Sequence, residues 1–183
     1  MFQETSLTKY LGLALLLVSC SVPGCSRYSA VSDYEQMQQA KKSFAELIAA
    51  AGGKAEEKAY AIAGASGDAW VLNLSGGKIS NELIDEIGKL IYVAELDLSK
   101  SNITDEQLLK LDELKVCKTV MNLNLSDTAI SDASFAKLKN LHCLSKANLK
   151  GTKVTKKGID EFRKSYLAHP NTVGFFKNPK FEI

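Results

Sequence analysis

The stretch ELDLS at residues 95–99 decides the fold, because three related stretches occur nearby: VLNLS at 71–75, NLNLS at 122–126 and KANLK at 146–150. The fourth residue of each stretch is a leucine, and successive leucines lie 24, 27 and 24 residues apart. A fixed period of this length indicates stacked structural units. The four leucines are Leu74, Leu98, Leu125 and Leu149.

Each copy continues in the same way after its first five residues. Five residues beyond the leucine comes a β-branched residue and then a hydroxyl residue, as in Ile103-Thr104. A hydroxyl here can accept a hydrogen bond from an amide at a helix start, and apolar residues such as Leu108 and Leu111 then recur at helical spacing. Each copy therefore predicts a strand, a turn and a helix, and only stacking can bury its apolar side. The hydroxyl positions are Ser80, Thr104, Ser131 and Thr155.

The shared pattern L-x-L-S-x-x-x-[IV]-[ST] resembles a bacterial leucine-rich repeat, close to the ribonuclease-inhibitor and cysteine-containing types. The resemblance covers about residues 69 to 175. It implies an α/β leucine-rich-repeat solenoid with short parallel strands on the concave face and helices on the convex face. It says little about function, because such folds host many partners. The pattern departs from many repeats where these have Asn, at Gly77, Ser101, Thr128 and Thr152.

The first part of the chain has the layout of a signal peptide, which we place at residues 1–19. Lys9 precedes an apolar run at 11–18 that is too short to span a bilayer. LVSC at 17–20 resembles a bacterial lipobox, which implies a diacylglyceryl group on the thiol of Cys20 and a lipid-anchored protein of the cell envelope. Ser21 then favours the outer membrane or the periplasmic face. An ordinary signal peptide, or an uncleaved anchor, is the alternative.

The remaining segments flank the repeats. We expect a tether at 20–32, an N-terminal cap at 33–68, repeats with a C-terminal cap at 69–176, and a loose tail at 177–183. The cap is expected to hold a helix at 33–51, a strand at 60–63 and a turn at 64–68, because terminal repeats need their open core covered. Trp70 should pack over that core. A closing edge strand is expected at 171–176.

The concave face is the predicted binding surface, since alternate strand residues share a face and the leucines point inward. Polar side chains there should form ladders across the strands, although such residues can also merely solvate an exposed sheet. The predicted binding residues are Asn73, Glu95, Asp97, Asn122, Asn124, Lys146, Asn148 and Lys150.

Charge is uneven along the chain, whose net charge is only +2. Residues 81–114 have a net charge of −6 and residues 137–183 of +8. The basic end can steer an anionic partner, but the pattern favours a solvated end without a partner. The overall balance gives no argument for nucleic acid.

Two cysteines, Cys117 and Cys143, precede the third and fourth strands, so a disulfide or two free thiols are both open. No spacing among His, Cys and acidic residues suits a metal, and no nucleophile has a recognisable base nearby. We therefore expect no cofactor and no enzyme. The sequence favours a membrane-tethered leucine-rich-repeat module that binds an unknown protein or acidic polymer. An envelope spacer is the alternative, and the lack of an added catalytic domain argues against a second alternative, an effector-like enzyme.

Overall fold

A six-stranded sheet with the order β1-β2-β3-β4-β5-β6 is the framework of residues 44–183. The structure is a computed structural model that describes residues 42–62, 65–90, 92–114, 118–168 and 178–183. The chain divides into the units 1–43 and 44–183, and nearly all of the first lies outside the described residues. The second unit is a mixed α/β fold in which an open, mostly parallel sheet alternates with helices.

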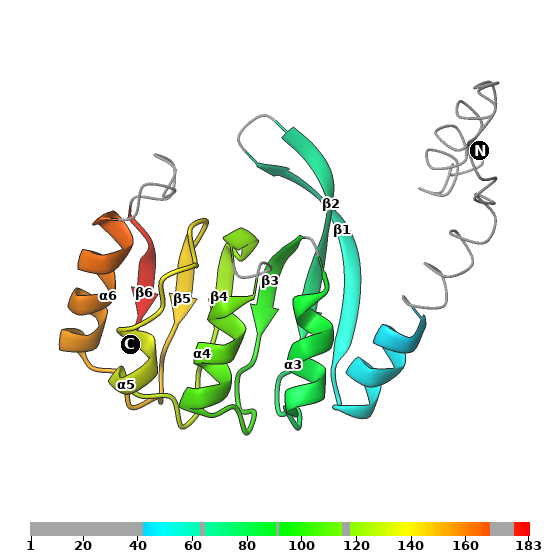
Figure 1. Ribbon diagram of the computed structural model, residues 1–183, viewed down its shortest axis with the longest axis horizontal. Helices are drawn as coiled ribbons and strands as arrows, with labels where there is room; N and C mark the ends of the chain where they lie inside the picture. The colour runs from blue at the N-terminus through cyan, green and yellow to red at the C-terminus, as the bar shows by residue number, and fades with distance from the viewer. Residues whose placement is uncertain (1–41, 63–64, 91, 115–117, 169–177) are drawn as a thin grey trace, which may run out of the picture. The chain divides into compact units, whose positions relative to one another are not determined.

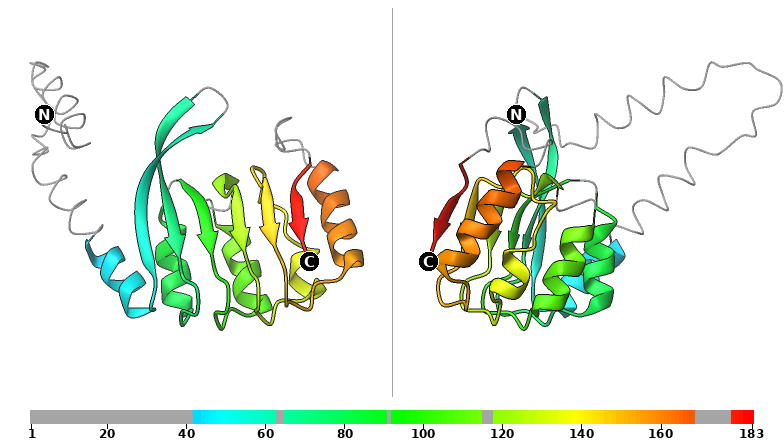
Figure 2. Two further views of the ribbon diagram at one scale, coloured as in Figure 1. Left: turned by 180° about the vertical axis from the view of Figure 1, so that it is seen from behind. Right: turned by 60° about the vertical axis from the view of Figure 1, so that its left-hand side comes forward.

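Strands and helices alternate after an N-terminal hairpin (Figure 1). The strands are β1 (Lys54–Ile62), β2 (Ala65–Asn73), β3 (Val93–Asp97), β4 (Asn122–Asn124), β5 (Lys146–Asn148) and β6 (Lys180–Glu182). The helices are α3 (Asn81–Gly88), α4 (Asp105–Glu113), α5 (Asp132–Phe135) and α6 (Lys156–Ala168), and a further helix covers residues 42–50. β1 and β2 are antiparallel, whereas every later pair is parallel. Helices α3 to α6 all lie on one face of the sheet, as the view from behind also shows (Figure 2).

The four leucines of the repeated stretch lie in file, as predicted. Each amide donates to the carbonyl oxygen that ends the next strand, from Leu74 to Asp97 (2.7 Å) and from Leu98 to Asn124 (2.8 Å). Leu125 and Leu149 continue the pattern to Asn148 and Glu182. All four side chains are buried. Burial of this file against its neighbours is favourable by roughly 25 cal/mol per Å² of apolar surface.

The predicted hydroxyl residues begin the helices. Ser80 accepts from the Leu83 amide, and Thr104 with Gln107 forms a complete capping box. Both satisfy amides that would otherwise lack a partner in the first helical turn.

Adjacent helices are also joined by a carboxylate that the sequence did not reveal. Asp105, in the first turn of α4, accepts from the amide (2.9 Å) and hydroxyl (2.6 Å) of Ser131 and from the hydroxyl of Ser134. Asp132 repeats the arrangement toward Thr155. The starts of α5 and α6 are thus each fixed to the preceding helix by charge-assisted hydrogen bonds, which are stronger than neutral ones.

The N-terminal hairpin is longer than predicted. The expected turn at 64–68 is wrong for residues 65–68, which belong to β2, and β1 already begins at Lys54 instead of residue 60. The charged stretch at 54–58 has weak strand preference on its own, but pairing with β2 overrides this. Trp70 packs edge-on against Phe44 of the preceding helix (5.4 Å between centroids), in keeping with its expected place over the core.

The C-terminal residues also differ from the expected loose tail. Lys180–Glu182 form β6, which pairs with β5, and the Phe181 ring packs against Phe135 and Phe162. The closing strand expected at 171–176 lies outside the described residues. Three residues are too few to show a strand period, so pairing and the Phe181 anchor define this strand. Within the described ranges, no helix combines the length and apolar character needed to cross a membrane.

We predict that Asp105→Ala lowers the free energy of unfolding by about 2 kcal/mol, because it removes the acceptor of the Ser131 amide and hydroxyl and leaves the Ser134 hydroxyl only a long bond to the Ser131 carbonyl (3.4 Å). Urea unfolding followed by circular dichroism measures this change. Asp160→Ala, at an exposed position on α6, is the matched control and should change stability by less than about 0.5 kcal/mol. Equal losses in both variants would contradict the role of Asp105.

The loss in Asp105→Ala should also depend on pH. Burial raises the pKa of Asp105, but hydrogen bonds from Ser131 and Ser134 outweigh this effect, so the pKa lies below its usual value. A lowered pKa stabilises the fold above the unfolded-state pKa, and that contribution is lost as pH falls through the folded-state pKa. The stability gap between wild type and variant should therefore shrink on acidification.

Candidate functional site

The face of the sheet opposite α3–α6 is covered by no helix that the structure describes (Figure 2, left). We call it the open face. A hollow of about 360 Å³ lies on it across β2 to β5. The hollow is lined by Val71, Leu72, Asn73, Glu95, Leu96, Asp97, Asn122, Leu123, Asn124, Lys146 and Asn148.

The strand register brings the predicted binding residues together in two rows. The first row crosses the sheet as Asn73, Asp97, Asn124 and Asn148, and β6 extends it with Glu182. The second row is Val71, Glu95, Asn122 and Lys146, extended by Lys180. Lys150 follows β5, and its ammonium group lies 3.3 Å from the carboxylate of Glu182, the last residue of the first row. Seven of the eight predicted residues line the hollow, and Lys150 is the exception.

The first row has a structural task at the ends of the strands. The Asp97 side chain accepts from the amide (2.9 Å) and hydroxyl (2.6 Å) of Ser99, and Asn124 binds Ser126 in the same way. A short side-chain oxygen that accepts from its own chain two residues on stabilises a turn. Asn73 and Asn148 each accept from the amide two residues further on. One oxygen of each side chain in this row is therefore already engaged.

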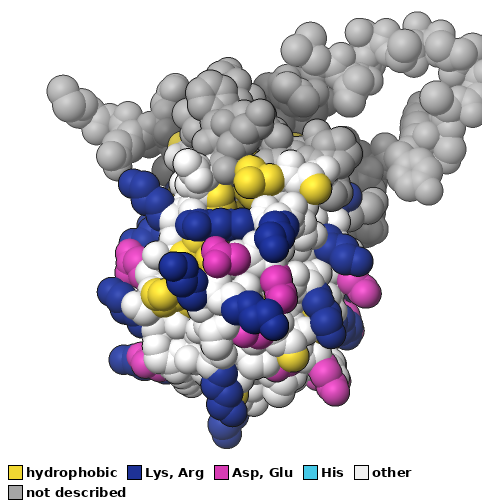
Figure 3. Space-filling view, turned by 90° about the vertical axis from the view of Figure 1, so that its left-hand side faces the viewer, with side chains coloured by type: hydrophobic (Ala, Val, Ile, Leu, Met, Phe, Trp, Pro, Cys, Tyr) yellow, Lys and Arg dark blue, Asp and Glu magenta, His cyan; other side chains and the backbone are white. Residues whose placement is uncertain are grey.

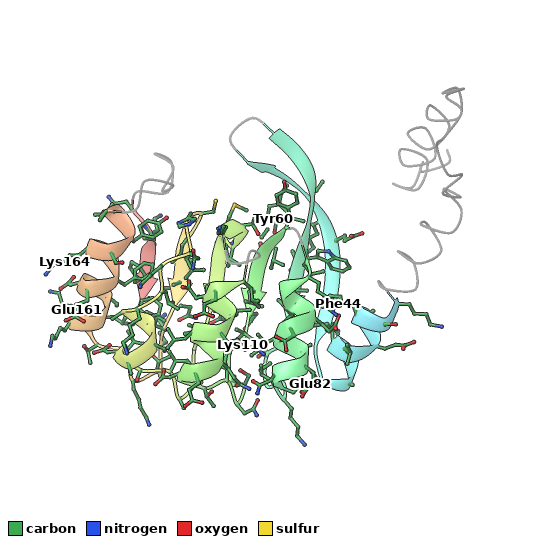
Figure 4. All side chains as sticks on the ribbon, in the orientation of Figure 1. Phe44, Tyr60, Glu82, Lys110, Glu161 and Lys164 are labelled. Atoms are coloured by element: carbon green, nitrogen blue, oxygen red, sulfur yellow. The ribbon has the colours of Figure 1, made fainter. Side chains whose placement is uncertain are left out.

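The second row reaches two residues that sequence reasoning missed. The Tyr60 hydroxyl, on β1, donates to Glu95 (2.5 Å) from the hairpin beside β3 (Figure 4). Glu182, on β6, accepts from the ammonium groups of Lys146 (2.6 Å) and Lys150 (3.3 Å). Recognising β1 as a full strand would have placed Tyr60 on this face, and recognising β6 would have placed Glu182 there.

These contacts change the ionisation of both missed residues. Burial, together with the hydrogen bond and negative charge of Glu95, raises the pKa of Tyr60 to about 12. Hydrogen bonds from Lys146 and Lys150, and their positive charges, hold the pKa of Glu182 below its usual value. Glu182 is therefore an anion at neutral pH that offsets part of the positive charge at β5.

At the basic C-terminal end, the lysines of the described residues are exposed and come from several different elements. Figure 3 shows Lys and Arg side chains spread over this end with acidic ones between them. Lys157 lies 3.8 Å from Glu161 on the same helix. Surface pairs of this kind contribute little to stability, and the mixed arrangement weakens the case for one strongly basic patch.

The other predicted sites lie mainly beyond the described residues. Cys20 and Cys117 fall outside them, so neither lipidation nor the disulfide is tested there. Cys143 is a half-buried free thiol whose pKa is raised by burial. In the described part of the chain, no group of three or more His, Cys, Asp or Glu side chains is placed to hold a metal ion.

Comparison with protein-family models and with curated proteins gives no match to this chain. Its function is therefore inferred from the residues of the open face.

We predict that Tyr60 remains protonated at about pH 11, where an exposed tyrosine with a pKa near 10 has largely ionised. The ultraviolet difference titration of wild type against Tyr60→Phe isolates this one residue. In Glu95→Gln the pKa of Tyr60 should fall, because the negative charge is gone, but burial should keep it above 10. Ionisation of Tyr60 near pH 10 in the wild-type protein would show that the contact with Glu95 does not form.

Proposed function

We propose that this chain is a leucine-rich-repeat module, tethered by lipid to the bacterial cell envelope, that binds a protein or polymer through its open face without catalysis. The observation that carries the proposal is the hollow of about 360 Å³, whose lining presents carboxylates, carboxamides and a lysine. Concave sites with a few convergent polar groups are the default expectation for ligand binding.

The assignment to leucine-rich repeats is supported by three features of the described residues. The leucines of the repeated stretch lie in file, parallel strands pair in register, and hydroxyl residues begin α3 and α4. A recurring strand and helix that bury their apolar sides against neighbours are typical of repeat proteins.

Binding is favoured over catalysis by the chemistry of the open face. The hydroxyls of Ser75 and Ser99 bond each other (2.9 Å), and Ser99 also donates to Asp97. A serine nucleophile needs an adjacent base such as imidazole. His142 is buried and forms no part of the hollow's lining.

A structural spacer is the second candidate, and the first row of the open face favours it. The row contributes a turn at the end of each strand, through Asn73, Asp97, Asn124 and Asn148. These residues would be needed for the fold even if no ligand existed. The two candidates differ in whether the second row retains a partner.

We predict that the full-length chain retains a partner from envelope extract and that the double change Lys146→Glu and Lys150→Glu abolishes retention. Reversing both charges repels an anionic contact at β5. Lys146→Gln with Lys150→Gln, which removes charge without adding acids near Glu182, should weaken retention in the same direction. The pull-down is followed by mass spectrometry and repeated at higher salt, which should reduce retention.

The matched control is Lys156→Glu with Lys164→Glu on α6, which makes the same charge change at two exposed positions. It should leave retention unchanged. Loss of retention in the control alone would move the contact to the basic end and contradict binding through the open face. Absence of any retained partner would favour the spacer.

The proposed tether is tested by metabolic labelling with an alkynyl fatty acid. We predict that the wild-type chain is labelled and fractionates with membranes, and that Cys20→Ala loses both properties, because lasting attachment requires acyl chains at this thiol. Cys25→Ala is the matched control and should be labelled like wild type. Labelling that persists in Cys20→Ala would contradict the assigned lipidation site.

A further inference from the structure

The hollow is electrically divided. Its charged lining residues are Glu95 and Asp97, both on β3, and Lys146, on β5. Neither carboxylate forms an ion pair with any residue in the described ranges. Neighbouring strands are about 4.8 Å apart, so the acidic strand and the lysine strand are separated by about 10 Å. A ligand complementary to this hollow carries a cation at one end and an anion at the other.

Between the charges, β4 presents two carboxamides. Asn124 uses its oxygen to bind Ser126, which leaves its NH₂ group as a donor. The Asn122 side chain lines the hollow and has no hydrogen bond to a described residue. A carboxamide offers one acceptor and two donors, which is the complement of a peptide group with its N–H and C=O. Asn122 is therefore placed to bond the backbone of a peptide that crosses the strands.

Lys146 retains capacity for a second anion although it contacts Glu182. An ammonium group has three donors, and Lys150 shares the Glu182 carboxylate. Glu182 also shows that a carboxylate can approach the Lys146 ammonium group to 2.6 Å on this face.

We propose that the hollow binds an extended polypeptide segment of mixed charge, with a Lys or Arg over Glu95 and Asp97 and an Asp or Glu three residues away at Lys146. The spacing follows from chain geometry. A polyproline II segment rises about 3.1 Å per residue and repeats every three residues, so positions i and i+3 share a face about 9 Å apart. It also leaves its backbone groups unpaired, as Asn122 requires. This inference rests on the proposed function and specifies the ligand.

Ligands of a single charge fit the hollow poorly. A nucleic acid or another acidic polymer would bring anions against Glu95 and Asp97, and like charges facing each other at an interface oppose binding. A wholly basic segment would meet Lys146 in the same way. The hollow should therefore select a ligand by the order and spacing of its charged residues and not by its net charge.

The test uses fluorescent proline-rich peptides, each with one Lys and one Glu, and measures fluorescence anisotropy with the full-length chain. Peptides with the two residues at i and i+3 should bind at least tenfold more tightly than those at i and i+2 or i and i+4. They should also bind more tightly than peptides with two Lys or two Glu, and high salt should weaken the binding.

Two conservative variants locate the peptide. Glu95→Gln keeps an acceptor for Tyr60 but removes the charge, and should weaken binding of the i, i+3 peptide about tenfold. Asn122→Ala should weaken it severalfold while leaving the preference for charge spacing intact. Glu106→Gln, at an exposed position on α4, is the matched control and should bind like wild type.

Equal affinity for all spacings, or binding that is unaffected by Glu95→Gln, would overturn the proposed ligand. Tighter binding of a glutamate homopolymer than of the i, i+3 peptide would do the same and identify an acidic polymer. These results are separable from the pull-down, because loss of an extract partner in the Lys146 and Lys150 variants would still support the open face as a binding surface.

Discussion

The structure depends on the hydrogen bond that each buried leucine of the repeated stretch makes to the end of the next strand. The Leu98 amide reaches the Asn124 carbonyl, and the Leu125 amide reaches the Asn148 carbonyl. Because each of these residues must also bury its side chain, one contact fixes both the pairing and the burial. The backbone amide would be costly to leave unpaired in the core, so a shift of register is opposed at every strand.

Consequences for the open face follow directly from that register. Helices α3 to α6 lie on the other face. Side chains two residues apart on one strand point to the same face, and residues at the same register on successive strands form the rows. The row of Asp97 and Asn124 ends the strands by binding the next turn. The row of Glu95 and Asn122 forms no such turn, and the Asn122 side chain has no hydrogen bond to a described residue.

The repeated stretches predicted the rows, the leucine file and the helix-capping hydroxyls, because all three depend on local order that recurs along the chain. Contacts across the fold escaped prediction. The charged sequence at residues 54–58 hid the first part of β1, so the strand that carries Tyr60 was predicted only from residue 60. The three residues of β6 were too short to show a period, so Glu182 was placed in a tail. The bond from Ser131 to Asp105 joins residues 26 apart and has no local signature.

The most direct test of this account is amide hydrogen exchange of the leucine file, measured residue by residue by nuclear magnetic resonance. The Leu98 and Leu125 amides should exchange only through large-scale opening, with protection close to the global free energy of unfolding. The Glu106 amide, in the first turn of α4, should exchange rapidly because it has no partner within the helix. Exchange of the Leu98 and Leu125 amides as fast as that of Glu106 would show that the strands are not paired in this register.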